Sequence, residues 1–161
     1  MLGIALKTSA VSPRERSYLY MQNLQILLPI MRQHAITLVT VYFDGSGDDG
    51  SIESIEFLPQ DHTDDFADLP VEILTTQSAF DDGHWVYQTT PEQMTLKDAI
   101  ETITYDYLEE TDTDWVNNDG GFGNLEIDVS TGTVTLEVNT RYTESTTEYS
   151  AERDIATGAE L

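Results

Sequence analysis

The chain has 161 residues, enough for one domain with a substantial hydrophobic core. It carries 30 acidic and 7 basic residues, a formal net charge of −23, and no cysteine. This composition excludes disulfides and thiolate metal sites, and it argues against direct binding to nucleic acid or anionic membranes, which bear charge of the same sign.

The N-terminal residues lack the basic and apolar regions of a signal peptide, and no apolar run approaches the length of a membrane span. Together with the absence of cysteine, this predicts a cytoplasmic protein.

A first helix is expected over residues 12–34. The stretch Ser12-Pro13-Arg14-Glu15 offers a cap, a proline at the first helical position and a capping box. Pro29 predicts a kink or an early end near Leu28. The apolar face that follows at helical spacing consists of Tyr20, Leu24, Leu27, Leu28 and Met31.

Two strands are expected next, at 36–43 and 51–58, pairing antiparallel across the glycine-rich segment 44–50. The apolar positions of the second strand do not alternate strictly, which predicts a bulge near Glu53–Ser54.

Residues 59–91 are mixed and acidic, with short strands predicted at Val71–Leu74 and Trp85–Gln88. A second helix begins after Thr95, which is expected to cap it with Asp98 at the third helical position. Its apolar face consists of Leu96, Ala99, Ile100, Ile103 and Tyr107.

The last predicted element is a β-hairpin, whose strands alternate apolar and polar residues on either side of the turn Ser130-Thr131-Gly132. Its apolar positions are Leu125, Ile127, Val129, Val134, Leu136 and Val138. After Tyr142 the periodicity is lost, so residues 143–161 are expected to form a loosely ordered acidic tail.

This order of elements predicts an α+β fold. Two hairpins would form an antiparallel sheet with two main helices packed on one face, in the order helix, hairpin, variable stretch, helix, hairpin. Residues 1–142 would form the single domain.

The segment 44–50, DGSGDDG, has three interpretations. A Ca²⁺ or Mg²⁺ site could use Asp44, Asp48, Asp49 and Glu53, although the spacing does not match an EF-hand. A phosphate cradle is disfavoured because three aspartates would repel the anion. We favour a hairpin loop whose aspartates cap their own backbone, and we expect no cofactor.

A second glycine-rich loop spans residues 115–124, with the sequence WVNNDGGFGN. It is interpreted either as a tight turn held by Trp115 and Phe122 or as a recognition loop at which Trp115 meets a partner. The first interpretation is favoured.

The combination of FDGSGDDGSIESIEF, a later helix and WVNNDGGFGNLEIDV resembles a family of small acidic bacterial proteins of unknown function. The resemblance covers about residues 36–142 and implies a shared fold, with no established activity. It also raises the hypothesis that the two glycine- and aspartate-rich loops meet in space.

Catalysis has little support in the sequence. His62 and His84 lie beside Asp61, Asp81 and Asp82, but their spacings match no zinc signature and no nucleophile motif is present. Both histidines are interpreted as surface residues, and we expect a protein that is not an enzyme.

The leading hypothesis is an acidic protein-binding module of the inhibitor, immunity or accessory type. It would dock a basic partner protein, for example one that grips nucleic acid and for which the acidic face is a DNA mimic. Alternatives are a divalent-metal protein or hydrolase centred on Asp44, Asp48 and Asp49, and a salt-adapted domain whose acidity serves solvation. The expected partner contacts are Asp44, Asp48, Asp49, Glu53, Glu109, Glu110, Asp112, Asp114, Trp115 and Asp119.

Overall fold

The fold is seen in a computed structural model, described here for residues 19–142 and 145–161. None of the helices within these residues is long and apolar enough to cross a membrane. The elements in chain order are α2 (Leu19–Gln33), β1 (Leu38–Ser46), β2 (Asp49–Leu58), the 3-10 turn η1 (Gln60–His62), α3 (Thr63–Ala67), β3 (Pro70–Asp81), β4 (His84–Thr95), α4 (Leu96–Thr111), β5 (Gly121–Asp128), β6 (Thr133–Arg141) and β7 (Ser145–Asp154).

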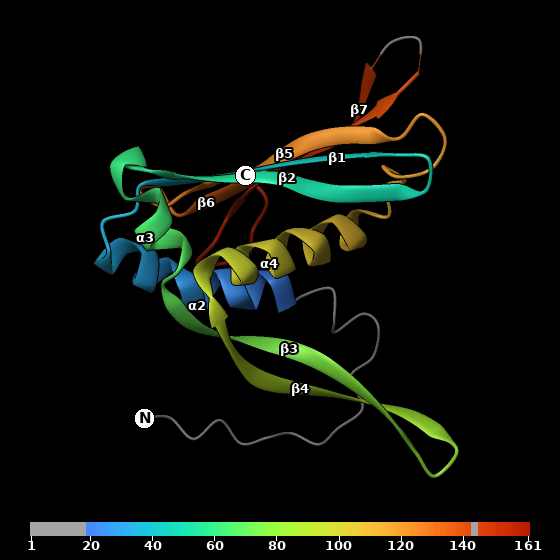
Figure 1. Ribbon diagram of the computed structural model, residues 1–161, viewed down its shortest axis with the longest axis horizontal. Helices are drawn as coiled ribbons and strands as arrows, with labels where there is room; N and C mark the ends of the chain where they lie inside the picture. The colour runs from blue at the N-terminus through green and yellow to red at the C-terminus, as the bar shows by residue number, and fades with distance from the viewer. Residues whose placement is uncertain (1–18, 143–144) are drawn as a thin grey trace.

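The main sheet has five antiparallel strands in the order β2-β1-β5-β6-β7. Helices α2 and α4 lie against one face of it, and the two-stranded sheet β3–β4 lies on the far side of these helices (Figure 1). The predicted α+β class is therefore confirmed.

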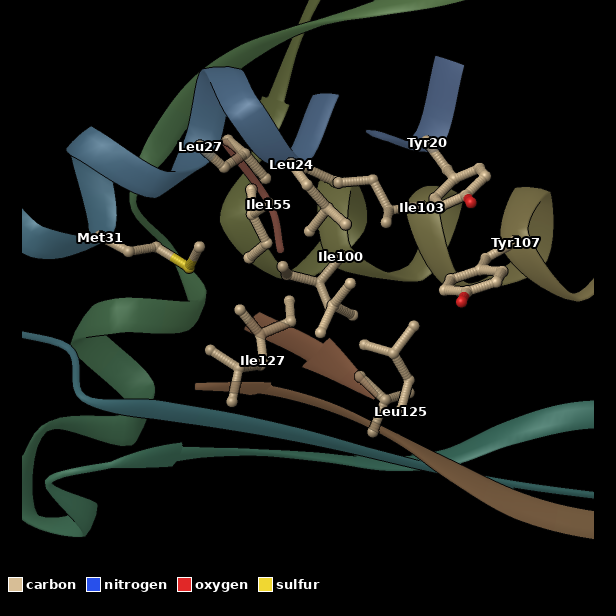
Figure 2. Close-up of a cluster of buried hydrophobic side chains, with 14 of the residues drawn as sticks. Tyr20, Leu24, Leu27, Met31, Ile100, Ile103, Tyr107, Leu125, Ile127 and Ile155 are labelled. Carbon is tan, nitrogen blue, oxygen red and sulfur yellow. The ribbon is translucent and has the colours of Figure 1, made fainter. Parts of the chain in front are cut away.

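The hydrophobic core lies between the sheet and the two helices. Side chains from the inner face of the strands, such as Leu125 and Ile127, meet the apolar faces of α2 and α4, as Figure 2 shows. The rings of Tyr20 and Tyr107 stack with their centroids 4.2 Å apart, and so join the two helices. All ten residues predicted for the two apolar helix faces are buried.

The opposite face of the sheet is largely polar, and no helix or strand of residues 19–142 and 145–161 packs on it (Figure 1). One row of directly paired residues runs across all five strands in the order Glu56, Thr40, Glu126, Thr135, Glu152. The three glutamates are exposed. The alternation of apolar and polar residues along each strand thus places acidic charge on this face.

Helix α2 continues through Pro29 to Gln33, close to the predicted bound of residue 34, so of the two outcomes predicted for Pro29 the early end near Leu28 does not occur. Pro29 lies on the exposed side, where water can satisfy the carbonyl that the missing N–H leaves free, while the buried side continues to Met31. The predicted capping box at residues 12–15 lies outside the described residues.

Helix α4 begins as predicted. The hydroxyl of Thr95 accepts a hydrogen bond from the backbone N–H of Asp98, at 3.2 Å. The helix ends at Thr111, followed by Asp112 in the left-handed conformation (φ 53°).

The pairing of the β1–β2 hairpin and its bulge were predicted correctly, but the predicted loop of residues 44–50, with aspartates that cap their own backbone, was wrong. Tyr42 pairs with Ser54 and Phe43 with Ile52, which leaves Glu53 as the extra residue of β2. The glycine-rich segment is a continuation of both strands, closed by a two-residue turn at Gly47 and Asp48 with φ values of 59° and 73°.

The short strands predicted at 71–74 and 85–88 are parts of a much longer hairpin, β3–β4, with 12 residues in each strand. Its turn is Asp82-Gly83, with φ values of 48° and 80°, the pair of left-handed conformations that a type I′ turn requires. The hairpin forms a sheet of its own because α2 and α4 separate it from the five-stranded sheet.

A buried amide ties this hairpin to α2. The side chain of Asn23 is fully buried, donates to the carbonyl of Leu74 at 2.9 Å and accepts from the N–H of Leu74 at 2.8 Å. The side-chain amide of Asn23 therefore satisfies both backbone polar groups of Leu74, as the backbone of a neighbouring strand would.

The prediction of a loosely ordered tail was wrong for residues 145–161. Residues 145–154 form β7, which pairs along β6, and Ile155 is buried in the core. Strand β7 lies at the edge of the sheet, and only one of its faces is covered. That face consists of Tyr149, Ala151 and Arg153, which are not a run of apolar residues, so the sequence pattern gave no sign of a strand.

Candidate functional site

The two glycine- and aspartate-rich loops meet, which confirms the hypothesis from the sequence. The N–H of Gly47 donates to the carbonyl of Asn118 at 3.2 Å, and the N–H of Asp48 donates to the carbonyl of Val116 at 3.0 Å. The β1–β2 turn is thus bound by its backbone to the segment that joins α4 to β5.

Glycine is required where the two segments touch. A Cβ on Gly120, which has a φ of 73°, would overlap the carbonyl oxygen of Gly45. A Cβ on Gly50 would lie 2.6 Å from the indole of Trp115. The repeated glycines therefore serve close approach between the loops.

Arg141, which the sequence did not single out, closes this contact. Its guanidinium donates to both carboxylate oxygens of Asp44, at 2.9 and 2.6 Å, and to the carbonyl of Gly45 at 3.1 Å. It also donates to the carbonyl of Gly121 and lies over the ring of Phe122. The hydrogen bonds to Asp44 raise the pKa of Arg141, so its guanidinium remains charged.

The ion pair between Arg141 and Asp44 argues against the hypothesis of a divalent-metal site at Asp44, Asp48 and Asp49. Asp44 is bound by Arg141, and residues 19–142 and 145–161 contain no group of three or more carboxylate or imidazole side chains placed to hold an ion. The set Asp44, Asp48 and Asp49 therefore does not converge on a common point in this structure.

Trp115 anchors the second loop from inside. Its ring meets Phe43 edge-on, with the centroids 5.2 Å apart, and its backbone and ring cover Gly45. The side chain is half-buried. These contacts support the interpretation of residues 115–124 as a turn held by aromatic side chains.

Two open hollows lie side by side at the C-terminal end of α4. The larger, about 540 Å³, has Asp112, Asp114, Asp119, Glu148 and Arg141 in its wall. We call it the carboxylate hollow. Because Asp44 already neutralises Arg141, the uncompensated charge of this wall is negative.

The smaller hollow, about 310 Å³, shares Asp112 and Asp114 with the larger one. Its wall also contains one further carboxylate, Glu109, and two aromatic side chains, Tyr105 and Trp115. A cationic side chain of a partner would find carboxylates and aromatic surface together there.

Asp114 also has a structural role. Its carboxylate accepts hydrogen bonds from the N–H of Asn117 at 3.0 Å, from the side-chain amide of Asn117 at 3.1 Å and from the N–H of Val116 at 3.3 Å. The backbone N–H of Asn117, followed by its amide, lowers the pKa of Asp114. Asp114 is therefore charged at neutral pH and shapes the loop that it belongs to.

The structure brings together only part of the predicted contact set. Glu109, Asp112, Asp114, Trp115 and Asp119 line the hollows, with Asp48 and Asp49 in the adjoining β1–β2 turn.

The remaining three predicted contacts have other surroundings. Asp44 is held by Arg141, and Glu53 lies in the bulge of the edge strand β2, where it accepts from Ser51 at 3.3 Å. Burial, followed by a hydrogen bond with Glu110, raises the pKa of the Tyr20 hydroxyl, so Glu110 faces α2.

The two histidines lie apart. His62 is in η1, where its Nδ1 is 3.8 Å from a carboxylate oxygen of Asp65, and both side chains are exposed. His84 begins β4, next to the turn at the tip of the β3–β4 hairpin.

Asp106 is expected to make stability depend on pH. Burial, and then the charge of Glu109, raise the pKa of Asp106 to about 6. Its carboxylate therefore destabilises the fold once ionised, and stability should fall as the pH rises from about 4 to 6. We expect Asp106→Asn to gain about 1–2 kcal/mol at pH 7, allowing for partial solvent screening, and nothing at pH 3. Urea unfolding at both pH values measures this, and an equal gain at both would contradict it.

The family model of a family of unknown function, DUF6878, matches residues 19–152. The chain belongs to this family. The match extends beyond the expected range of 36–142, since it includes α2 and most of β7 as well as both glycine-rich loops. Neither a curated protein nor a solved structure matches the chain significantly.

Proposed function

We propose that the protein is a non-enzymatic binding module that docks a basic partner protein at the carboxylate hollow. Lysine or arginine side chains of the partner would enter between Asp112, Asp119 and Glu148, with the β1–β2 turn beside them. Such a module would act as an inhibitor, immunity protein or accessory subunit, and a partner that grips nucleic acid would meet it as a DNA mimic.

The observation that carries this proposal is the position of the charge relative to α4. Six acidic residues and no basic one fall between residues 106 and 119, at the C-terminal end of the helix. The helix dipole is negative at that end, so the carboxylates next to the last turn, such as Glu109 and Asp112, cost stability. Solubility would be served equally well by carboxylates placed elsewhere, which indicates a role for these in particular.

The basic side chains support the same conclusion. Of the four within the described residues, Arg32 donates to the carbonyl of Val129, Arg141 holds Asp44, and Arg153 donates to the hydroxyl of Tyr107. These three stabilise the fold internally. The counter-charge for the hollow would then come from a partner.

The test compares two variants with the same change of net charge. Asp112→Asn/Asp119→Asn/Glu148→Gln removes three charges from the hollow, while Glu56→Gln/Glu126→Gln/Glu152→Gln removes three from the open face of the sheet. Asp114 is left unchanged because it shapes the loop.

Each protein is immobilised and exposed to lysate of the native cell at about 0.1 M NaCl, then washed at about 0.5 M, where exposed charges are screened. We expect the wild type and the sheet-face variant to retain one basic protein until the salt wash, and the hollow variant to lose it. Equal loss by both variants would contradict the assignment to the hollow. Recovery of no salt-sensitive basic protein would reject the function.

A second candidate function is solvation in high salt, because acidic residues also occur on the open face of the sheet, on α3 and at the tip of the β3–β4 hairpin. Unfolding measured across KCl concentrations separates the two. A solvation role predicts a chain that unfolds at about 0.1 M and refolds at molar salt, whereas the binding proposal predicts a folded chain at both.

The cost of the charges at the helix end can be measured directly. We expect Asp112→Asn to stabilise the protein by about 0.5–1 kcal/mol, because asparagine tolerates the left-handed conformation and removes a charge from the negative end of α4. The control is Asp98→Asn in the first turn of the same helix, which should lose about 0.5 kcal/mol. Chemical denaturation of both measures this, and changes of the same sign would contradict it.

A further inference from the structure

The β3–β4 hairpin extends well beyond the part that packs on the body. Near its base Val71 and Ile73 are buried, and Asn23 binds the backbone of Leu74. Residues 77–85 are all exposed, and Figure 1 shows this end projecting away from the helices. Half of the hairpin therefore contributes little to the core.

The tip of this hairpin presents two large aromatic side chains to solvent. Phe80 and Trp85 pair across the strands next to the Asp82-Gly83 turn and meet edge-on, with centroids 5.6 Å apart. Phe80 is 65% exposed and Trp85 61%. A pair of large apolar side chains this open, at the end of a projecting element, is typical of an interaction site.

The pairing alone does not explain this exposure. A cross-strand aromatic pair stabilises a hairpin by at most about 1 kcal/mol through the surfaces that the two rings share. The remaining surface of both rings faces water. Burying it against another molecule would recover the hydrophobic free energy that the folded monomer leaves unused.

We propose that the tip of the β3–β4 hairpin inserts Phe80 and Trp85 into an apolar recess of another protein, rimmed by lysine or arginine. The type I′ turn and the ring contact hold the two side chains in place before binding, which lowers the entropy lost on docking.

Charge selects the kind of partner. Asp81 and Asp82 lie between Phe80 and Trp85 in the sequence, with His84 paired opposite Asp81, and there is no lysine or arginine between Arg32 and Lys97. A second copy of this chain would bring four aspartates together between two molecules of net charge −23 without a counter-ion. A recess rimmed by cations has the complementary sign.

This surface is separate in the sequence and in the fold from the carboxylate hollow, so the inference does not depend on the proposed function. The hollow could fail to bind anything while the tip still docks, and the reverse also holds.

The first step of the test finds what the tip touches. A photoreactive benzoylphenylalanine replaces Phe80 in one full-length protein and Tyr42, on the open face of the sheet, in another. Both are irradiated in the native cell and the adducts are mapped by mass spectrometry. We expect position 80, and not position 42, to label one protein at a peptide that combines apolar residues with lysine or arginine.

The second step measures affinity with that purified partner. Phe80→Thr/Trp85→Thr should weaken binding at least about 10-fold, the effect of removing interface anchors. Gln77→Thr/Gln88→Thr, a directly paired exposed control on the same hairpin, should leave it within about 2-fold. Protection of the Leu74 amide from hydrogen exchange verifies that both variants keep the hairpin docked.

Every other outcome counts against the proposal. Adducts with a second copy of the chain would assign the tip to self-association, and adducts with lipid would assign it to a membrane. Absence of any protein adduct from position 80, or an unchanged affinity of the Phe80→Thr/Trp85→Thr variant, would overturn it.

Discussion

Gly120→Ala is expected to destabilise the protein by about 3–5 kcal/mol, the sum of a left-handed backbone and a steric clash. The φ of Gly120 is 73°, and an added Cβ would overlap the carbonyl oxygen of Gly45. The change should separate the β1–β2 turn from the segment 116–118, with loss of exchange protection at the amides of Gly47 and Asp48.

Gly47→Ala is the matched control. Its φ of 59° imposes the same kind of backbone strain, but no atom lies within 4 Å of the added Cβ. We therefore expect a loss of only about 1–2 kcal/mol. Equal losses for the two glycines in urea unfolding would show that the contact with Gly45 contributes nothing.

Asn23→Leu is expected to cost about 2–4 kcal/mol, because it leaves the N–H and the carbonyl of Leu74 without their partner inside the protein. Leucine has a similar volume, so the loss reports hydrogen bonding and not a cavity. We expect the β3–β4 hairpin to lose exchange protection first.

Gln25→Leu provides the comparison on the same helix. Gln25 is exposed, and its amide donates a single hydrogen bond to the carbonyl of Ala156, so its replacement should change the stability by less than about 0.5 kcal/mol. If Asn23→Leu were as mild as this, the hairpin would be held by its apolar contacts alone.

The elements that could be predicted are those whose structure is determined by the residues of the element itself. The hairpin around Ser130-Thr131-Gly132 alternates strictly, and the start of α4 is set by the hydroxyl of Thr95. The bulge at Glu53 followed from a break in alternation within β2. In each case the signal lies within a few residues of the feature.

Elements that depend on a neighbour distant in sequence were missed or shortened. The outer halves of β3 and β4 bury little, so their sequence is rich in threonine and glutamine, and the Asp82-Gly83 turn was the only strong signal of a hairpin. Strand β7 is specified by pairing with β6, and its covered face includes the polar Arg153 in place of an apolar run.

The candidate site shows the same division. The acidic crowding at the end of α4 was visible in the sequence. That Arg141 does not neutralise the carboxylates of the hollow was not visible, because it depends on the ion pair between Arg141 and Asp44, 97 residues away. Pairwise contacts at that separation leave no periodic signal in a single chain.

The backbone bonds between the β1–β2 turn and residues 116–118 also constrain how this family can diverge. A residue inserted into either segment would shift its amides away from the carbonyls of the other. Members of the family that have an insertion or deletion in one segment should therefore have a matching one in the other. A relative in which only one segment is longer should lack the hydrogen bonds between the two segments.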